Sequence, residues 1–98
     1  MSDYTLSPEA ILDLTDIYDF TVGEWGEAQA EKYLHEIYAV FERLTKFPHI
    51  GRLRAVLSDG LRSIPTGSHI IFFMPWQGNI AIVRVLHGSR DVESLFVA

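Results

Sequence analysis

The feature that most constrains the fold is a stripe of apolar residues with helical spacing in the middle of the chain. Its members recur every three or four positions and are Ala30, Tyr33, Leu34, Ile37, Tyr38, Phe41 and Leu44. This spacing places them on one side of a helix, which must bury that side against another element. Phe47-Pro48 follows, and because proline cannot continue the hydrogen-bond ladder, we expect the helix to end there.

A second helix is predicted directly before this one. Ser7 is a good N-cap residue and Pro8 suits the first helical position. One side of this helix carries the spaced residues Ala10, Leu14, Ile17, Tyr18 and Thr21. Three acids lie largely away from that side and predict a solvated face: Asp13, Asp16 and Asp19. Gly23 and Gly26 mark a connection that is too short for anything but an antiparallel helical hairpin.

Strands are predicted on both sides of the hairpin. Tyr4-Thr5-Leu6 precedes it, and residues 61–65, 68–74 and 79–86 follow it as apolar blocks separated by turn-like breaks. Residues 49–60 look like an irregular segment that returns the chain to the sheet. The order β-α-α-β-β-β predicts an α+β fold, in which the helical hairpin packs on one face of a mostly antiparallel sheet.

Chain length and composition limit the classes of protein that this sequence can represent. Its 98 residues predict a single domain over residues 1–98. No apolar run approaches the roughly 20 residues that cross a bilayer, so we expect no membrane segment. The start shows no basic region followed by an apolar signal core, which predicts a cytoplasmic protein. Without cysteine, disulfides and thiolate metal sites are excluded.

The charge is divided unevenly along the chain. Residues 1–50 carry ten acids and three bases, whereas residues 51–98 carry five bases, all arginine, and three acids, for a net charge of −5. Proteins that grip nucleic acid through its phosphates are usually basic, because counterion release supplies much of the binding. A pI near 5.2 therefore predicts no direct specific nucleic-acid binding and favours a protein partner.

Several segments, taken in order, resemble the ParE toxins, the toxic halves of bacterial toxin–antitoxin pairs within the wider RelE-like superfamily. They are Leu6-Ser7-Pro8-Glu9-Ala10, Trp25-Gly26, Phe47-Pro48-His49-Ile50-Gly51-Arg52, the block from Gly67 to Phe73 and the block from Ile80 to Gly88. The resemblance implies the same helix-hairpin-on-sheet fold. It also implies a toxin that inhibits DNA gyrase by stabilising the cleaved-DNA state, with no catalytic residues and no cofactor of its own.

The resemblance further implies a ParD-like antitoxin whose flexible C-terminal arm wraps the toxin. We expect arginines of the sheet to pair with acidic groups on the arm, and the hairpin to supply an apolar groove. Phe20, Trp25, Phe73 and Trp76 lie near element ends, where half-exposed aromatic rings often mark a docking surface. For Trp25 a hydrophobic plug is the favoured explanation, and Trp76 is the better candidate for contact. The predicted antitoxin-binding residues are Tyr18, Trp25, Arg62, Phe73, Trp76 and Arg84.

The end of the chain is the predicted target-facing element. Gly88-Ser89 frees the chain from the preceding strand, which leaves Arg90 facing outward. The predicted target-binding residues are therefore His87, Arg90 and Phe96. Leu95, Phe96 and Val97 equally suit a last strand.

A RelE-like ribonuclease that cuts ribosome-bound message is the alternative function. Those toxins use a cluster of arginines, lysines and a tyrosine or histidine to activate the 2′-hydroxyl and to stabilise the developing phosphate charge. Here Arg62, His87 and Arg90 would be catalytic. However, one catalytic arginine of that branch falls at His69, and its terminal tyrosine falls near Phe96, which has no hydroxyl. The incomplete set favours the ParE reading. A non-toxic binding relative is the third possibility.

Three polar side chains of the strands have structural explanations as well. His69 and His87 are predicted at strand ends, and a lone strand histidine is more often a satisfied structural group than a ligand, since no metal-binding spacing accompanies them. Arg84 is expected to form an ion pair inside the domain, with Asp91 or Glu93.

Overall fold

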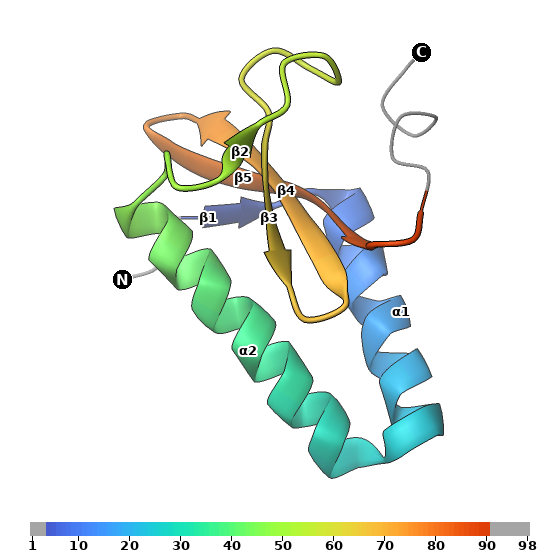
Figure 1. Cartoon of the computed structure of the whole chain (residues 1–98). Helices are drawn as coiled ribbons and strands as arrows, with labels where there is room; N and C mark the ends of the chain where they lie inside the picture. Colours follow the sequence, from blue (N-terminus) through green and yellow to red (C-terminus); the bar gives the residue numbers. More distant parts are fainter. Residues whose placement is uncertain (1–3, 91–98) are drawn as a thin grey trace.

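The computed structural model describes residues 4–90, in which a helical hairpin packs on a five-stranded sheet (Figure 1). The elements are β1 (Tyr4–Leu6), α1 (Pro8–Trp25), α2 (Glu27–Lys46), β2 (Arg52–Leu53), β3 (Arg62–Thr66), β4 (His69–Trp76) and β5 (Asn79–His87). The predicted fold class and order of elements are confirmed. The strand β2 was missed, because two residues are too few to show a strand pattern.

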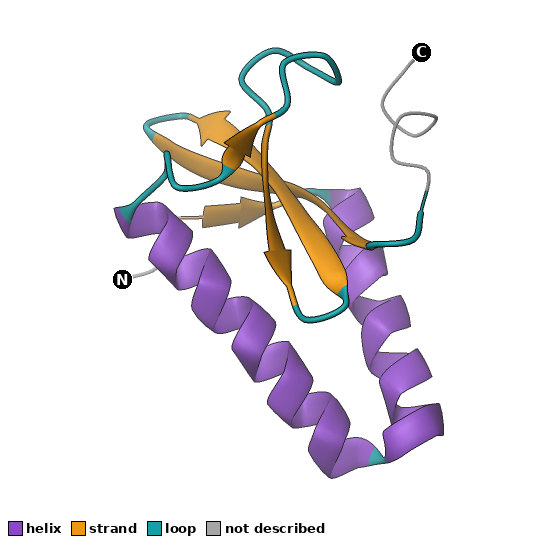
Figure 2. Ribbon diagram, viewed as in Figure 1, coloured by secondary structure: helices purple, strands orange, loops and turns teal. Residues whose placement is uncertain are grey.

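The sheet joins the two ends of the described chain. Its order is β1-β5-β4-β3-β2, with β1 parallel to β5 and every other pair antiparallel (Figure 2). Tyr4 lies opposite Ile80 and Leu6 opposite Ile82, so the first strand pairs with the last. A β-bulge between β4 and β5 near Phe72 shifts the register. Because of the shift, Val85 joins Ile80 and Ile82 in the core beneath the helices.

Two clusters of buried side chains lie on the protein's sheet. The larger one fills the space between the hairpin and the sheet and includes Ile37, Phe41 and Phe73. The smaller one joins Leu57 of the loop before β3 to Phe72 and other strand residues. The face of the sheet away from the hairpin is thus covered in part by that loop.

The start of α1 is fixed to the sheet as well as capped. Ser7 is the N-cap, as predicted, and its Oγ accepts a hydrogen bond from the Ala10 amide at 3.0 Å. The same Oγ donates to the Val83 carbonyl at 2.7 Å, and the Ser7 amide donates to the Ile82 carbonyl at 3.0 Å. A single serine therefore ends the edge strand, begins the helix and binds both to β5.

The outer ends of the two helices match the prediction, but their connection does not: Gly23, predicted to lie in it, is part of α1, and Gly26 alone joins the helices. The last turn of α2 ends at Phe47, directly before the proline. Within residues 4–90, no helix combines the length and the apolar character that crossing a membrane requires.

Candidate functional site

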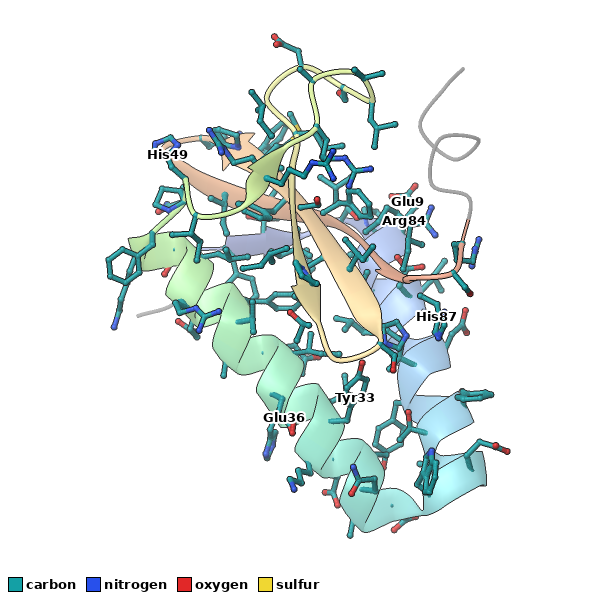
Figure 3. All side chains as sticks on the ribbon, viewed as in Figure 1. Glu9, Tyr33, Glu36, His49, Arg84 and His87 are labelled. Carbon is teal, nitrogen blue, oxygen red and sulfur yellow. The ribbon has the colours of Figure 1, made fainter. Side chains whose placement is uncertain are left out.

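A groove of about 700 Å³ runs between the helical hairpin and the ends of β4 and β5. Its walls come from the second half of α1 and the start of α2, and its floor from the last residues of β5 and the first of β4. We call it the hairpin groove. Its lining includes Asp13, Asp16, Phe20, Trp25, Gln29, Tyr33, His69, His87 and Arg90. Figure 3 shows Tyr33 and His87 facing the space between α2 and the strand ends.

The floor of the hairpin groove carries a cluster of Tyr33 and two histidines. The Tyr33 hydroxyl lies 2.6 Å from Nδ1 of His69 and accepts a hydrogen bond from the Ser68 amide at 3.1 Å. His69 and His87 face each other across paired strands, with ring centroids 5.4 Å apart. Both histidines lie at strand ends, as predicted. His69 also has a hydrogen-bond partner inside the fold, Tyr33, as expected of a structural histidine.

Burial and charge act on this cluster in the same direction. Partial burial lowers the pKa of His69, the neighbouring His87 lowers it further, and only the more distant Asp13 opposes them. Burial also raises the pKa of the Tyr33 hydroxyl. A His69 ring without a proton on Nδ1 can accept a hydrogen bond from the Tyr33 hydroxyl, so the lowered pKa of His69 agrees with this contact.

The turn before β4 makes this arrangement possible. Gly67 has a φ of +58°, and a Cβ at that position would lie 2.7 Å from the Tyr33 ring. Glycine is therefore required twice over, for the left-handed backbone and for the close approach of the ring. The predicted Thr66-Gly67 break is the sequence signal for this contact.

The prediction for Asp13 was wrong. Predicted on a solvated face of α1, Asp13 instead forms a two-pronged ion pair with Arg84, whose Nε and Nη2 donate to its two carboxylate oxygens at 2.8 and 2.9 Å. It also accepts a hydrogen bond from the Val85 amide at 2.9 Å. The hydrogen bond to Asp13 raises the pKa of the Arg84 guanidinium. Arg84 is thus paired inside the fold; its two expected partners, Asp91 and Glu93, lie outside the described residues.

The predicted antitoxin-binding residues do not form one surface. Trp25, with 73 % of its surface exposed, stands on the rim of the hairpin groove, whereas Tyr18 lines a smaller hollow of about 400 Å³ elsewhere on the hairpin. Trp76 is half-exposed at the opposite end of β4. Phe73 was wrongly expected to be exposed: its ring is 1 % exposed and belongs to the main core, so it offers nothing to a partner.

The three residues of the ribonuclease alternative are separated. His87 and Arg90 both line the hairpin groove. Arg62 pairs with Phe73 on the neighbouring strand β4. Phe73 is four residues along β4 from His69, so Arg62 lies about 13 Å along the sheet from the level of His69 and His87. Its guanidinium donates to the Gly51 carbonyl at 2.8 Å, so it holds a backbone carbonyl inside the fold. Phe96 lies outside the described residues.

Sequence reasoning missed two residues of the groove. Tyr33 was assigned to the core because it belongs to the apolar stripe of α2, yet its hydroxyl reaches the strand ends. Asp13 carried a weak signal, since it lies between apolar neighbours on a helix. Its partner is 71 positions away along the chain, a separation that local spacing cannot reveal.

Known proteins share the fold and have similar sequences. The family of the ParE toxin of the type II toxin–antitoxin system, parDE, matches residues 4–92. The chain belongs to the ParE toxin family. It is accordingly a toxin of the type II toxin–antitoxin class, as the sequence resemblance implied.

Relatives of this ParE-family toxin match along nearly their whole length. It is 41% identical to Toxin ParE1 of Mycobacterium tuberculosis (strain ATCC 25618 / H37Rv) over 93 residues, covering 94% of this chain and 95% of the relative. It is 34% identical to Toxin ParE1 of Caulobacter vibrioides over 94 residues, covering 96% and 97%. A solved structure of the chromosomal ParDE TA system from P. aeruginosa has the same fold, with a TM-score of 0.75 at 24% identity, covering 89% of this chain and 96% of that one.

Proposed function

We propose that this toxin arrests growth by inhibiting DNA gyrase, and that a ParD-like antitoxin neutralises it by placing its arm in the hairpin groove. The observation that carries the binding part of the proposal is the rim of the groove. Trp25 and Phe20 are 73 % and 69 % exposed there, beside a floor of strand ends. Large exposed aromatic rings next to a concave surface are typical of a docking site.

The polar groups of the groove favour recognition over catalysis. The Asp13 carboxylate is occupied by Arg84 and by the Val85 amide, and the Tyr33 hydroxyl is occupied by His69 and Ser68. A general base needs a free lone pair directed at a substrate proton. His87 and Arg90 remain accessible, but Arg62 lies at another level of the sheet. These contacts support a toxin that acts by binding, in a cytoplasmic setting where gyrase and the antitoxin are found.

The charges around the groove specify the kind of arm that fits. Its α1 wall carries Asp16 in addition to the neutralised Asp13, whereas His87 and Arg90 lie at the strand end. An amphipathic segment with apolar side chains against Trp25, a basic side chain toward Asp16 and an acidic side chain toward Arg90 complements this pattern. Because His87 and Arg90 are also the proposed target-binding residues, an arm in the groove covers them and blocks the target directly.

The decisive experiment is a supercoiling assay with purified gyrase, scored for inhibition and for accumulated cleaved DNA. We expect both, and we expect both to disappear when the antitoxin is added in equal amount. Arg90→Ala should weaken inhibition, whereas Gln29→Ala, on the opposite wall, serves as the matched control. Unaffected gyrase at excess toxin would refute the gyrase target, and cleavage of message in intact ribosomes would then establish the ribonuclease alternative.

A further inference from the structure

A second surface of the molecule differs from the hairpin groove in both charge and shape. Residues 43–56, from the last turn of α2 through β2 to the loop beyond, contain four lysines and arginines, one histidine and no acid. Four large apolar side chains in this segment are exposed: Phe47 by 56 %, Ile50 by 49 %, Leu53 by 52 % and Val56 by 93 %. We call this segment the basic end. Figure 1 shows the end of α2, β2 and the following loop at the end of the molecule away from the α1–α2 connection.

The fold holds the basic end in a defined shape. Gly51 is buried, and a Cβ there would lie 2.7 Å from the Phe73 ring and 2.9 Å from the Ser63 carbonyl oxygen. Arg62 donates to the Gly51 and His49 carbonyls, and the Arg54 amide donates to the Leu61 carbonyl at 2.7 Å. The backbone is therefore pressed against the sheet at Gly51, while its neighbours Ile50 and Arg52 remain exposed.

The cations of this surface are not neutralised within the described chain. Arg43, Lys46 and Arg52 are exposed and form no ion pair with an acid of residues 4–90. Arg54 donates to the Ser63 hydroxyl at 3.1 Å and lies over the Phe72 ring, so it too keeps its full charge. By contrast, residues 4–42 carry nine acids and one base. An uncompensated positive surface beside an acidic helical half attracts and orients an acidic partner.

We propose that the basic end is a second docking surface, which binds an acidic protein segment bearing apolar side chains on the toxin's cellular target. The exposed apolar residues favour a protein over nucleic acid, whose contacts are mainly to phosphate. The hairpin groove places an acid, Asp16, on its α1 wall and Arg90 at the strand end, whereas the basic end carries cations and no acid, so one short antitoxin arm does not suit both surfaces. The antitoxin therefore takes the groove, and the target takes the basic end together with the groove's His87 and Arg90.

This inference rests on the proposed function for its target, and the test separates the two. The double variant Arg52→Glu/Val56→Ser alters only exposed side chains. Lys32→Glu, on an exposed position of α2 outside the basic end, is the matched control because it makes the same change in charge. Circular dichroism and urea unfolding establish that both variants fold like the wild type.

Three measurements are then made on each protein: growth arrest on expression without antitoxin, inhibition of supercoiling by purified gyrase, and affinity for the ParD-like antitoxin by calorimetry. We expect the double variant to lose growth arrest and to need roughly tenfold more protein for half-inhibition, a loss of about 1.4 kcal/mol in binding. Antitoxin affinity should stay within about twofold, since changes at distant, independent sites do not couple. Lys32→Glu should behave like the wild type in all three.

Other outcomes decide against one proposal or the other. Full growth arrest by the double variant overturns the basic end as a target surface. If the double variant also binds the antitoxin about tenfold more weakly than the wild type does, the basic end is an antitoxin surface instead. If the wild type binds plasmid DNA in the absence of gyrase and the double variant does not, the basic end is a nucleic-acid surface and the proposal is overturned. If the wild type arrests growth but leaves gyrase unaffected while the double variant is harmless, the gyrase proposal fails and the basic end stands. A wild type that does neither overturns both.

Discussion

The hairpin groove and the basic end differ in whether their polar side chains have partners within the fold. In the groove, Asp13 pairs with Arg84 and Tyr33 pairs with His69, so polar side chains from distant parts of the chain satisfy one another. At the basic end, Arg43, Lys46 and Arg52 have no acidic partner among residues 4–90. Paired charge holds elements of the fold together, whereas unpaired charge remains available to another molecule. The following predictions test this division, from the largest expected effect to the smallest.

The largest effect is expected in the core that separates the two surfaces. Phe73→Ala removes a ring that is 1 % exposed and should lower the free energy of unfolding by about 3–5 kcal/mol, measured by urea denaturation. Phe20→Ala, whose ring is 69 % exposed, should cost less than about 0.5 kcal/mol. If Phe73→Ala is as stable as the wild type but no longer binds the antitoxin, Phe73 belongs to the docking surface after all.

The ion pair beneath the hairpin groove comes next. Asp13→Ala leaves the half-buried Arg84 guanidinium and the Val85 amide without their acceptor, and should lower the free energy of unfolding by about 2–3 kcal/mol. Asp16→Ala, one turn along the same helix and exposed, should cost less than about 0.5 kcal/mol. Equal losses in the two variants would mean that Asp13 is only one more solvated acid.

The two exposed tryptophans test which surface the antitoxin uses. Trp25→Ala should weaken antitoxin binding by roughly tenfold or more, because it removes the largest aromatic ring at the groove, while the unfolding free energy stays nearly unchanged. Trp76→Ala, at the other end of β4, should leave the dissociation constant within about twofold. If calorimetry shows that both substitutions weaken binding alike, the arm spans both ends of the sheet.

The smallest effect is a pH dependence of stability. The pKa of His69 is lowered in the folded protein, so just below its ordinary value of about 6.5 the unfolded chain binds more protons than the folded one. Stability should therefore rise with pH through that window and fall as the pH drops below about 6.5. His69→Gln should flatten this part of the curve of unfolding free energy against pH, and the non-titrating control Gln29→Ala should not. An unchanged slope in His69→Gln would exclude this histidine as its source.

The sequence predicted the parts of the molecule that local pattern determines. The stripe on α2, the Ser7-Pro8 start of α1 and the glycine turns between strands each have a physical cause within a few residues, and all were confirmed. Phe73 was misjudged because its position near a strand end suggested exposure, whereas packing of the helical hairpin encloses it. The partners of Asp13 and Tyr33 were missed because they come from strands far along the chain.

The candidate site was therefore predicted only as scattered residues. Trp25, His87 and Arg90 do line one groove, but Arg62 and Trp76 lie at other levels of the sheet. Which strand ends adjoin is decided by sheet order and by the β-bulge near Phe72, neither of which has a local sequence signal. The roles of these residues toward antitoxin and target stay predictions.

The parallel pairing of β1 with β5 has a consequence for folding during synthesis on the ribosome. β5 lies between β1 and β4, although among the strands of residues 4–90 it is synthesised last. Until residues 79–87 emerge from the exit tunnel, β1 has no neighbour and Ser7 and Asp13 lack their acceptors and donors on β5. Contacts that span most of the chain form late and slowly. The sheet is thus completed only when synthesis is nearly over, so a prematurely terminated chain lacks both the hairpin groove's floor and the fold that would make it toxic.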